Sequence, residues 1–234
     1  MPESDIMLAD TRQGDDLRII AHRGGRGFGT DNTLDAMRTA VRAGVRELET
    51  DVRQTADGQL VICHDAIVRG RTVSRMTFDD LRKHSPDRTL LSDLLEELAG
   101  WCVFNLEIKE ADEAAIGETL ETYGITADTL VSSFDREFLL SFKRGHPGVK
   151  TGLLYRMPYG QGRKLQNGLT AGADVVLPHF GAVDDELVEH AHGMGLEVYT
   201  WTVNDIDDAK GLEAIGVDAI ITDRYLELKA ALQA

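Results

Sequence analysis

The sequence predicts an α/β protein with a TIM-like (β/α)8 barrel and a β-hairpin excursion after the second strand. Three observations lead to this fold. The length of 234 residues is close to the ~250 residues typical of a single barrel. Short apolar runs of β character alternate with segments of helical period along the chain. Several helical segments also end in a glycine directly before the next strand, as at Gly44, Gly124 and Gly172, and glycine there suits the left-handed end of a helix.

Eight apolar runs are expected to form the parallel strands of the barrel. They cover residues 17–21, 46–52, 102–108, 129–134, 151–155, 173–178, 197–203 and 218–222. Helices are expected between them, for example over 31–44, 135–145, 184–195 and 205–216. In the first of these, Leu34, Met37, Ala40 and Val41 share one face. A strand, a helix and a second strand in succession are typical of a βαβ unit, which builds parallel sheets.

The run over 59–65 breaks this alternation. It follows the strand at 46–52 after a connection that is too short to hold a crossover helix. The connection contains Asp57-Gly58, which is a tight-turn signal. The two strands are therefore expected to pair in an antiparallel hairpin.

The domain organisation is expected to be simple. Residues 1–16 are polar and acidic without periodicity, which predicts a mobile N-terminal arm. No linker rich in proline, glycine or serine divides the rest, so 17–234 is expected to form one barrel domain. Because the first residues lack a basic start followed by an apolar stretch, the expected location is cytoplasmic.

Composition narrows the class of partner. The formal charge is −15, which disfavours binding to bulk nucleic acid and stable association with an anionic membrane, since both attract basic proteins. A small anionic molecule remains a possible partner if positive charge is local, and the oligomeric state stays open. Cys63 and Cys102 lie far apart in apolar runs and are expected to be reduced core thiols.

Polar residues at the ends of apolar strands are the candidates for a functional site, because the site of such a barrel lies at the carboxyl ends of its strands. Four strands provide them. The candidates are His22 and Arg23, Glu49 and Asp51, His64 and Asp65, and Glu107 and Lys109.

The acidic candidates predict a metal site. Glu49 and Asp51 are two residues apart in a strand and point to one face, and the same holds for Glu107 and Lys109. Three converging carboxylates suit a hard divalent cation such as Mg²⁺ or Ca²⁺. Glu47 lies earlier in its strand and is left out of the set. The alternative is an internal salt-bridge cluster with Arg23 and Lys109. These two positive charges would leave the negative charge of one of the three carboxylates without a partner.

The basic candidates and the histidines indicate phosphoryl chemistry. Arg23 and Lys109 can hold a phosphate, the first as a fork and the second as a point charge. His22 and His64 can act as general base and general acid near neutral pH. Together with a metal, these groups predict cleavage of a phosphodiester.

Several motifs resemble the glycerophosphodiester phosphodiesterase family and occur in the order and at the spacing of that family. They are AHRGG, DNT, ETDV, ADGQLVICHD, LEIK, VSSFD, TWTVN and GVDAIITDR, and they extend from residue 17 to about residue 224. The resemblance implies a TIM-like barrel that hydrolyses small glycerophosphodiesters to glycerol 3-phosphate and an alcohol. It makes His22 and His64 the acid–base pair, Arg23 and Lys109 the phosphate contacts, and Glu49, Asp51 and Glu107 the metal ligands. Trp201 is expected to wall the substrate pocket.

Two features depart from the usual pattern. The family usually has Pro-Glu-Asn-Thr where this chain has residues 30–33, and Asp31 is interpreted as a helix N-cap there. The segment after Asp65 is compact, which leaves the preferred substrate open. One alternative is a lysophospholipase D, which needs an apolar groove for which the loop 157–162 is the only candidate. Another is a catalytically silent barrel that binds phosphorylated ligands. The presence of both His22 and His64 argues against it, because a binding protein does not need a proton-transfer pair.

Overall fold

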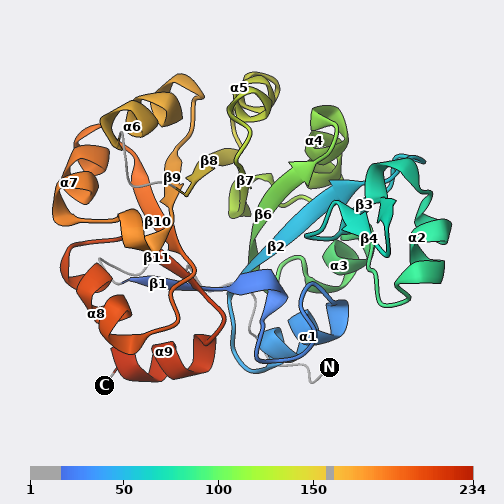
Figure 1. Ribbon diagram of the computed structural model, residues 1–234, viewed down its shortest axis with the longest axis horizontal. Coiled ribbons are helices and arrows are strands. Elements are labelled where there is room, and N and C mark those ends of the chain that lie inside the picture. The colour runs from blue at the N-terminus through green and yellow to red at the C-terminus, as the bar shows by residue number, and fades with distance from the viewer. Residues whose placement is uncertain (1–16, 157–160, 234) are drawn as a thin grey trace.

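The computed structural model describes residues 17–156 and 161–233 and contains the helices and strands of Figure 1. The strands are β1 (Arg18–Ala21), β2 (Glu47–Gln54), β3 (Leu60–Ile62), β4 (Ile67–Val68), β5 (Arg71–Thr72), β6 (Val103–Glu110), β7 (Thr129–Ser133), β8 (Lys150–Tyr155), β9 (Val175–Pro178), β10 (Glu197–Trp201) and β11 (Ala219–Thr222). The α-helices are α1 (Leu34–Arg42), α2 (Phe78–His84), α3 (Leu91–Leu98), α4 (Glu113–Thr122), α5 (Arg136–Gly145), α6 (Gln161–Thr170), α7 (Asp185–Gly193), α8 (Ile206–Ala214) and α9 (Tyr225–Leu232). Short 3₁₀ helices are η1 (His22–Gly24), η2 (Val73–Arg75), η3 (Thr126–Asp128) and η4 (Phe180–Ala182).

The parallel strands close into the expected barrel. Within the described residues they run in the order β1, β2, β6, β7, β8, β9, β10 and β11, and β11 pairs with β1 to complete the ring. Helices surround this ring on its outside (Figure 1). Because the strands are parallel, their carboxyl ends meet at one mouth.

Apolar side chains fill the barrel and the space under the helices. A cluster inside the ring includes Ile20, Leu154, Val175, Leu177 and Tyr199. Larger clusters lie between the strands and the outer helices. The free cysteines Cys63 and Cys102 are both buried, as the sequence predicts.

The hairpin excursion is confirmed. β3 pairs antiparallel with β2, with Val52 opposite Ile62 and Gln54 opposite Leu60. The chain then forms β4, β5 and α2, which lie at the outer edge of the barrel in Figure 1. This segment has a small core of its own, which includes Val61, Cys63 and Leu81.

Two expectations fall outside the described residues. They are the arm over 1–16 and most of the loop 157–162, of which the residues 157–160 are not described. In the part of the chain that is described, no helix is long and apolar enough to cross a membrane.

Candidate functional site

Strand register brings the three predicted carboxylates together at the mouth of the barrel. Asp51 on β2 lies beside Glu107 on β6, and Glu49 lies beside Asn105. One carboxylate oxygen from each of Glu49, Asp51 and Glu107 lies within 4.8 Å of the others. All three residues are buried. The parity of the two strands is thus sufficient to build the predicted acidic cluster.

The electrostatics of this cluster fit a bound cation. Glu49 Oε1 is buried and has no hydrogen-bond partner. Burial, together with the charge of Asp51, raises the pKa of Glu49 to about 8. Burial also raises the pKa of Glu107, although Lys109 opposes that shift. Arg23 and Lys109 do not neutralise all three carboxylates. A hard divalent cation bound by their oxygen atoms would balance the remaining negative charge.

Both predicted phosphate contacts lie against the acidic cluster. Lys109 Nζ is 3.1 Å from Asp51 Oδ1 and also pairs with Glu107. The backbone N–H of Arg23 donates to Glu49 Oε2 at 2.8 Å. The Arg23 guanidinium nitrogen Nε is 3.8 Å from Asp51 Oδ2. The two positive side chains therefore border the same pocket from β6 and from the turn after β1.

The turn after β1 has a conformation that directs Arg23 into the site. Arg23 has φ 51° and ψ 39°, which is the left-handed region. Gly24 follows with φ 72°, and a Cβ there would lie 2.4 Å from the Met37 side chain. A glycine at this position lets the turn pack closely on α1.

His22 is held by two acidic groups. Its Nδ1 lies 2.7 Å from Asp223 Oδ1, and its Nε2 lies 3.8 Å from Glu49 Oε2. Burial by itself would lower the pKa of His22, but the hydrogen bond to Asp223 and the charge of Glu49 raise it above its ordinary value. The Asp223 contact fixes the orientation of the ring, so His22 is positioned to hold or transfer a proton at Nε2.

His64 approaches the cluster from the hairpin. The backbone N–H of Cys63 donates to the Asp51 carbonyl oxygen at 2.8 Å, which joins the end of the hairpin to β2. His64 Nδ1 lies 2.8 Å from Asp65 Oδ1, and about a third of the side chain is exposed, at 35%. Burial raises the pKa of Glu107, and the nearby His64 opposes that rise only slightly. His64 therefore lies nearer to solvent than His22.

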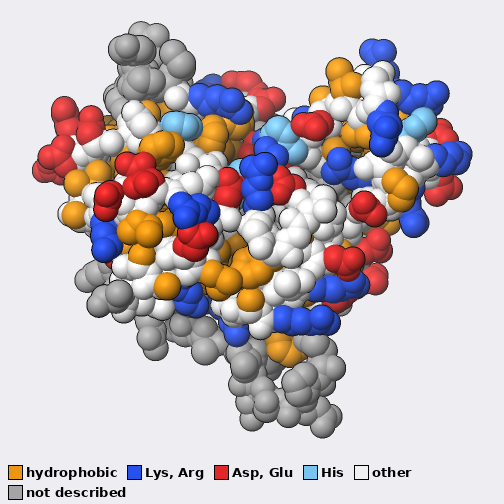
Figure 2. All heavy atoms as spheres, turned by 60° about the horizontal axis from the view of Figure 1, so that its bottom comes forward, with side chains coloured by type: hydrophobic (Ala, Val, Ile, Leu, Met, Phe, Trp, Pro, Cys, Tyr) orange, Lys and Arg blue, Asp and Glu red, His pale blue; other side chains and the backbone are white. Residues whose placement is uncertain are grey.

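Acidic, basic and histidine side chains gather near the centre of the face drawn in Figure 2, beside the hollow between its two upper lobes. Of the predicted site residues, His64 is about a third exposed, whereas Glu49, Asp51 and Glu107 are buried.

Family comparison agrees with this geometry. The sequence profile described as the glycerophosphoryl diester phosphodiesterase family matches residues 22–227. The chain belongs to this family. The match contains every predicted site residue, from His22 to Trp201.

Relatives of this phosphodiesterase family span the same length. A Mycobacterium tuberculosis protein named probable glycerophosphodiester phosphodiesterase 2 is 32% identical, over 88% of this chain and 86% of that protein. The glycerophosphodiester phosphodiesterase of Caldanaerobacter subterraneus subsp. tengcongensis is 29% identical, over 88% of this chain and 93% of its own. A crystal structure from Silicibacter pomeroyi, of a protein named putative glycerophosphoryl diester phosphodiesterase, superposes with a TM-score of 0.84 at 29% identity, and the match covers 93% of both chains.

This family member also uses an asparagine whose role the sequence analysis missed. Asn32 is buried and has φ 56°. Its Nδ2 donates to Asp51 Oδ2 at 2.9 Å, and its Oδ1 accepts from Thr50 Oγ1 at 2.8 Å. Asparagine tolerates the left-handed conformation better than most residues. Its place in the DNT motif, before a helix, was the available signal.

The interpretation of Asp31 as a helix N-cap is wrong. Thr33 caps α1, since its side chain accepts from the backbone N–H of Ala36. Asp31 instead lies between two arginines, 3.5 Å from Arg23 and 3.3 Å from Arg26. The helix begins at Leu34, so the cap lies two residues after Asp31.

The aromatic rim of this phosphodiesterase site includes the predicted Trp201. Trp201 lines a pocket with His22, Glu49 and Glu107. Its indole N–H donates to the Leu177 carbonyl oxygen at 2.8 Å, which fixes the ring.

A second aromatic side chain, Phe134, was missed. It meets the Trp201 ring edge to face, with 5.7 Å between the ring centroids. Phe134 directly follows the buried strand β7; the sequence places it at the end of an expected strand and in the VSSFD motif without indicating a role. The rule that polar residues end functional strands could not select it.

Proposed function

We propose that this chain hydrolyses glycerophosphodiesters to glycerol 3-phosphate and an alcohol, with the help of a bound divalent cation. As a member of its family, the chain is a phosphoric diester hydrolase. The observation that carries the proposal is the buried cluster of Glu49, Asp51 and Glu107 with Lys109 and His22 beside it. Such a set suits an anionic phosphate that is approached by a proton donor.

Binding of the substrate is assigned to the basic side chains and the acidic cluster. Glu49, Asp51 and Glu107 would hold Mg²⁺ or Ca²⁺, which would neutralise phosphate charge and polarise a phosphoryl oxygen. Arg23 and Lys109 would then contact the phosphate, because both are basic side chains that lie against the cluster.

Proton transfer is assigned to His22 and His64. One of them would take a proton from the attacking oxygen and the other would protonate the leaving alkoxide. His22 is oriented by Asp223, which acts through it as a positioning residue. Trp201 would form an apolar wall of the pocket.

The test is the release of glycerol 3-phosphate from glycerophosphocholine, glycerophosphoethanolamine and glycerophosphoglycerol. The reaction is followed with EDTA, with Mg²⁺ and with Ca²⁺, for the wild type and for His64→Ala and Glu49→Ala. We expect activity that requires metal and falls in both variants, by about 100-fold or more for His64→Ala. His190→Ala is the matched control, because His190 is exposed on α7.

Three other outcomes contradict the proposal. Cleavage of lysophosphatidylcholine alone indicates a lysophospholipase D. If the wild type cleaves no diester with any metal but binds glycerol 3-phosphate, the barrel is a binding protein. Equal activity in the presence of EDTA contradicts the metal requirement.

A further inference from the structure

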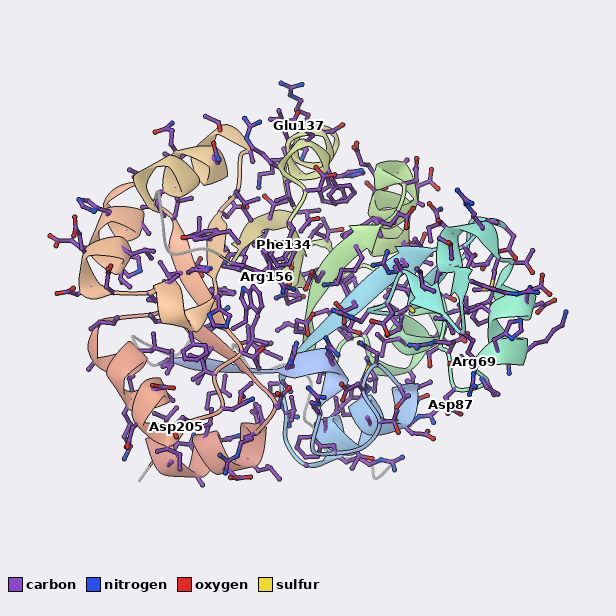
Figure 3. The ribbon with its side chains drawn as sticks, in the orientation of Figure 1. Arg69, Asp87, Phe134, Glu137, Arg156 and Asp205 are labelled. Atoms are coloured by element: carbon purple, nitrogen blue, oxygen red, sulfur yellow. The ribbon has the colours of Figure 1, made fainter. Side chains whose placement is uncertain are left out.

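Arg156 lies over the aromatic side chains at the mouth of the barrel, directly after β8. Its guanidinium carbon is 5.5 Å from the centroid of the Phe134 ring and 5.4 Å from that of Trp201. Figure 3 shows Arg156 and Phe134 near each other over the centre of the barrel. A cation at such a distance is attracted by the negative face of an aromatic ring. The Arg156 guanidinium is thus the cation that the rings of Phe134 and Trp201 attract.

Arg156 and Lys109 both lie beside the Phe134 ring, but they differ in whether carboxylates neutralise their charge. Lys109 Nζ is 5.7 Å from the Phe134 centroid and is neutralised by Asp51 and Glu107. Arg156 is exposed, and its guanidinium forms no ion pair with any carboxylate among residues 17–156 and 161–233. Its charge therefore acts on whatever enters the outer part of the mouth.

This step rests on the proposed function. The substrates of that reaction differ in the alcohol, and the alcohol occupies the outer part of the mouth. Glycerol and phosphate are common to all glycerophosphodiesters, and the buried carboxylates with Arg23 and Lys109 match these groups. The alcohol beyond the phosphate then extends outward, toward the side chains that end β7, β8 and β10. Arg156, Phe134 and Trp201 are these side chains, so they meet the head group.

We infer that Arg156 sets the head-group preference by excluding quaternary ammonium groups. Proteins bind trimethylammonium groups through aromatic faces, and here Phe134 and Trp201 already have a guanidinium beside them. A second positive charge at the same place is repelled. Diesters with an uncharged or anionic alcohol, such as glycerophosphoglycerol, are therefore cleaved in preference to glycerophosphocholine.

Two substrates of the same shape test this charge effect. One is glycerophosphocholine, and the other is its 3,3-dimethylbutyl analogue, in which carbon replaces the quaternary nitrogen. For the wild type we expect kcat/KM to favour the uncharged analogue by about fivefold, since exposed charges interact only modestly. Arg156→Gln should bring the two values close to equality, and Arg156→Glu should reverse the preference.

Arg82→Gln is the matched control. Arg82 on α2 lies 5.8 Å from the centroid of the Phe78 ring, a similar pair away from the barrel mouth. This variant should keep the wild-type ratio.

The inference and the proposed function fail in different ways. If wild type, Arg156→Gln and Arg156→Glu share one ratio, or if both substrates lose activity in parallel, Arg156 only packs the rim and the inference is wrong. If the wild type cleaves neither substrate and does not cleave glycerophosphoglycerol, the proposed function itself is wrong.

Discussion

At the scale of single residues, Asp223 controls how His22 can act. Burial would raise the pKa of Asp223, but hydrogen bonds from His22 and Asn204 lower it to about 2. The carboxylate is therefore ionised at every working pH and keeps the imidazole in one orientation. The AHRGG motif of the family was sufficient to identify His22 as a site residue. Asp223, its hydrogen-bond partner, was not predicted from the sequence.

We expect Asp223→Asn to lower kcat/KM by about 10- to 100-fold, as is typical when the partner that orients a functional histidine is removed. Because the carboxylate raises the pKa of His22, the limb of the pH–rate profile that reports His22 should also move to lower pH. Asp218→Asn is the control, since Asp218 pairs with the exposed His192 at 2.9 Å. A loss of activity with an unmoved profile would assign Asp223 a purely structural role.

Glu49 links metal binding to the pH dependence of stability. Its pKa is 4.5 in a model compound and about 8 in the folded chain. The folded state thus holds a proton that the unfolded state releases, so the stabilisation is full below pH 4.5 and is lost as the pH rises through 8. A bound cation favours the ionised carboxylate and removes this loss.

Thermal unfolding checks this coupling. With EDTA, the melting temperature should fall between about pH 5.5 and about pH 8, and added Mg²⁺ or Ca²⁺ should raise it more at the higher pH. Glu49→Gln should flatten both effects, because the amide does not titrate. An equal rise at both pH values would argue against Glu49 as a ligand.

At the scale of elements, the start of α1 fixes the position of the turn that carries Arg23 and Asn32. The Thr33 side chain accepts from the Ala36 N–H and donates to the Thr30 carbonyl oxygen at 2.8 Å. We expect Thr33→Ala to lower the free energy of unfolding by about 1 kcal/mol. Chemical denaturation measures this loss, and Thr33→Ser should restore most of it. If Thr33→Ala left the free energy of unfolding unchanged, the assignment of the cap to Thr33 would be wrong.

Elements whose order is visible in the sequence were predicted well. The eight barrel strands and the hairpin follow from apolar runs and connection lengths, and the side-chain alternation of β2 and β6 placed Glu49, Asp51 and Glu107 on one face. The partner of His22 lies 201 residues away, so it depends on closure of the ring between β11 and β1. No local period contains that information.

Residues in irregular segments were the hardest to predict. Asn32 acts from a loop with a positive φ, and Arg156 acts only because β7, β8 and β10 bring it over two distant rings. Neither belongs to a strand whose alternation reveals its direction. These contacts exist only once the whole barrel has closed.

At the scale of the whole molecule, the two ends of the barrel differ in role. The mouth contains the candidate site, and the opposite end contains ion pairs that stabilise the ring. The end opposite the mouth has a pocket of about 410 Å³ that is lined by Arg18, Glu47, Lys150, Glu197 and Tyr199 among others. Arg18 Nε is 3.3 Å from Glu47 Oε1, and Lys150 Nζ is 2.6 Å from Glu197 Oε1. Glu47, which was left out of the metal set, takes part in this opposite network. These pairs join β1, β2, β8 and β10 and stabilise the ring.

We expect Arg18→Met to lower the free energy of unfolding by about 1–3 kcal/mol, because Glu47 would lose its ionic partner. The value of kcat/KM should stay at the wild-type level, since Arg18 lies at the end away from the mouth. Denaturation and kinetics on the same samples separate the two effects. A fall in kcat/KM without a loss of stability would show that the two ends are coupled.

The excursion after β2 has a consequence for how such enzymes diversify. The three carboxylates and Lys109 belong to the ring, whereas His64 comes from a segment with its own small core. The part of that segment that follows His64 and Asp65 can therefore be lengthened or shortened while the ring and both histidines stay in place. Descendants of one ancestral barrel could acquire new substrate ranges by changing that single stretch of fewer than about 30 residues, within the size of one supersecondary unit.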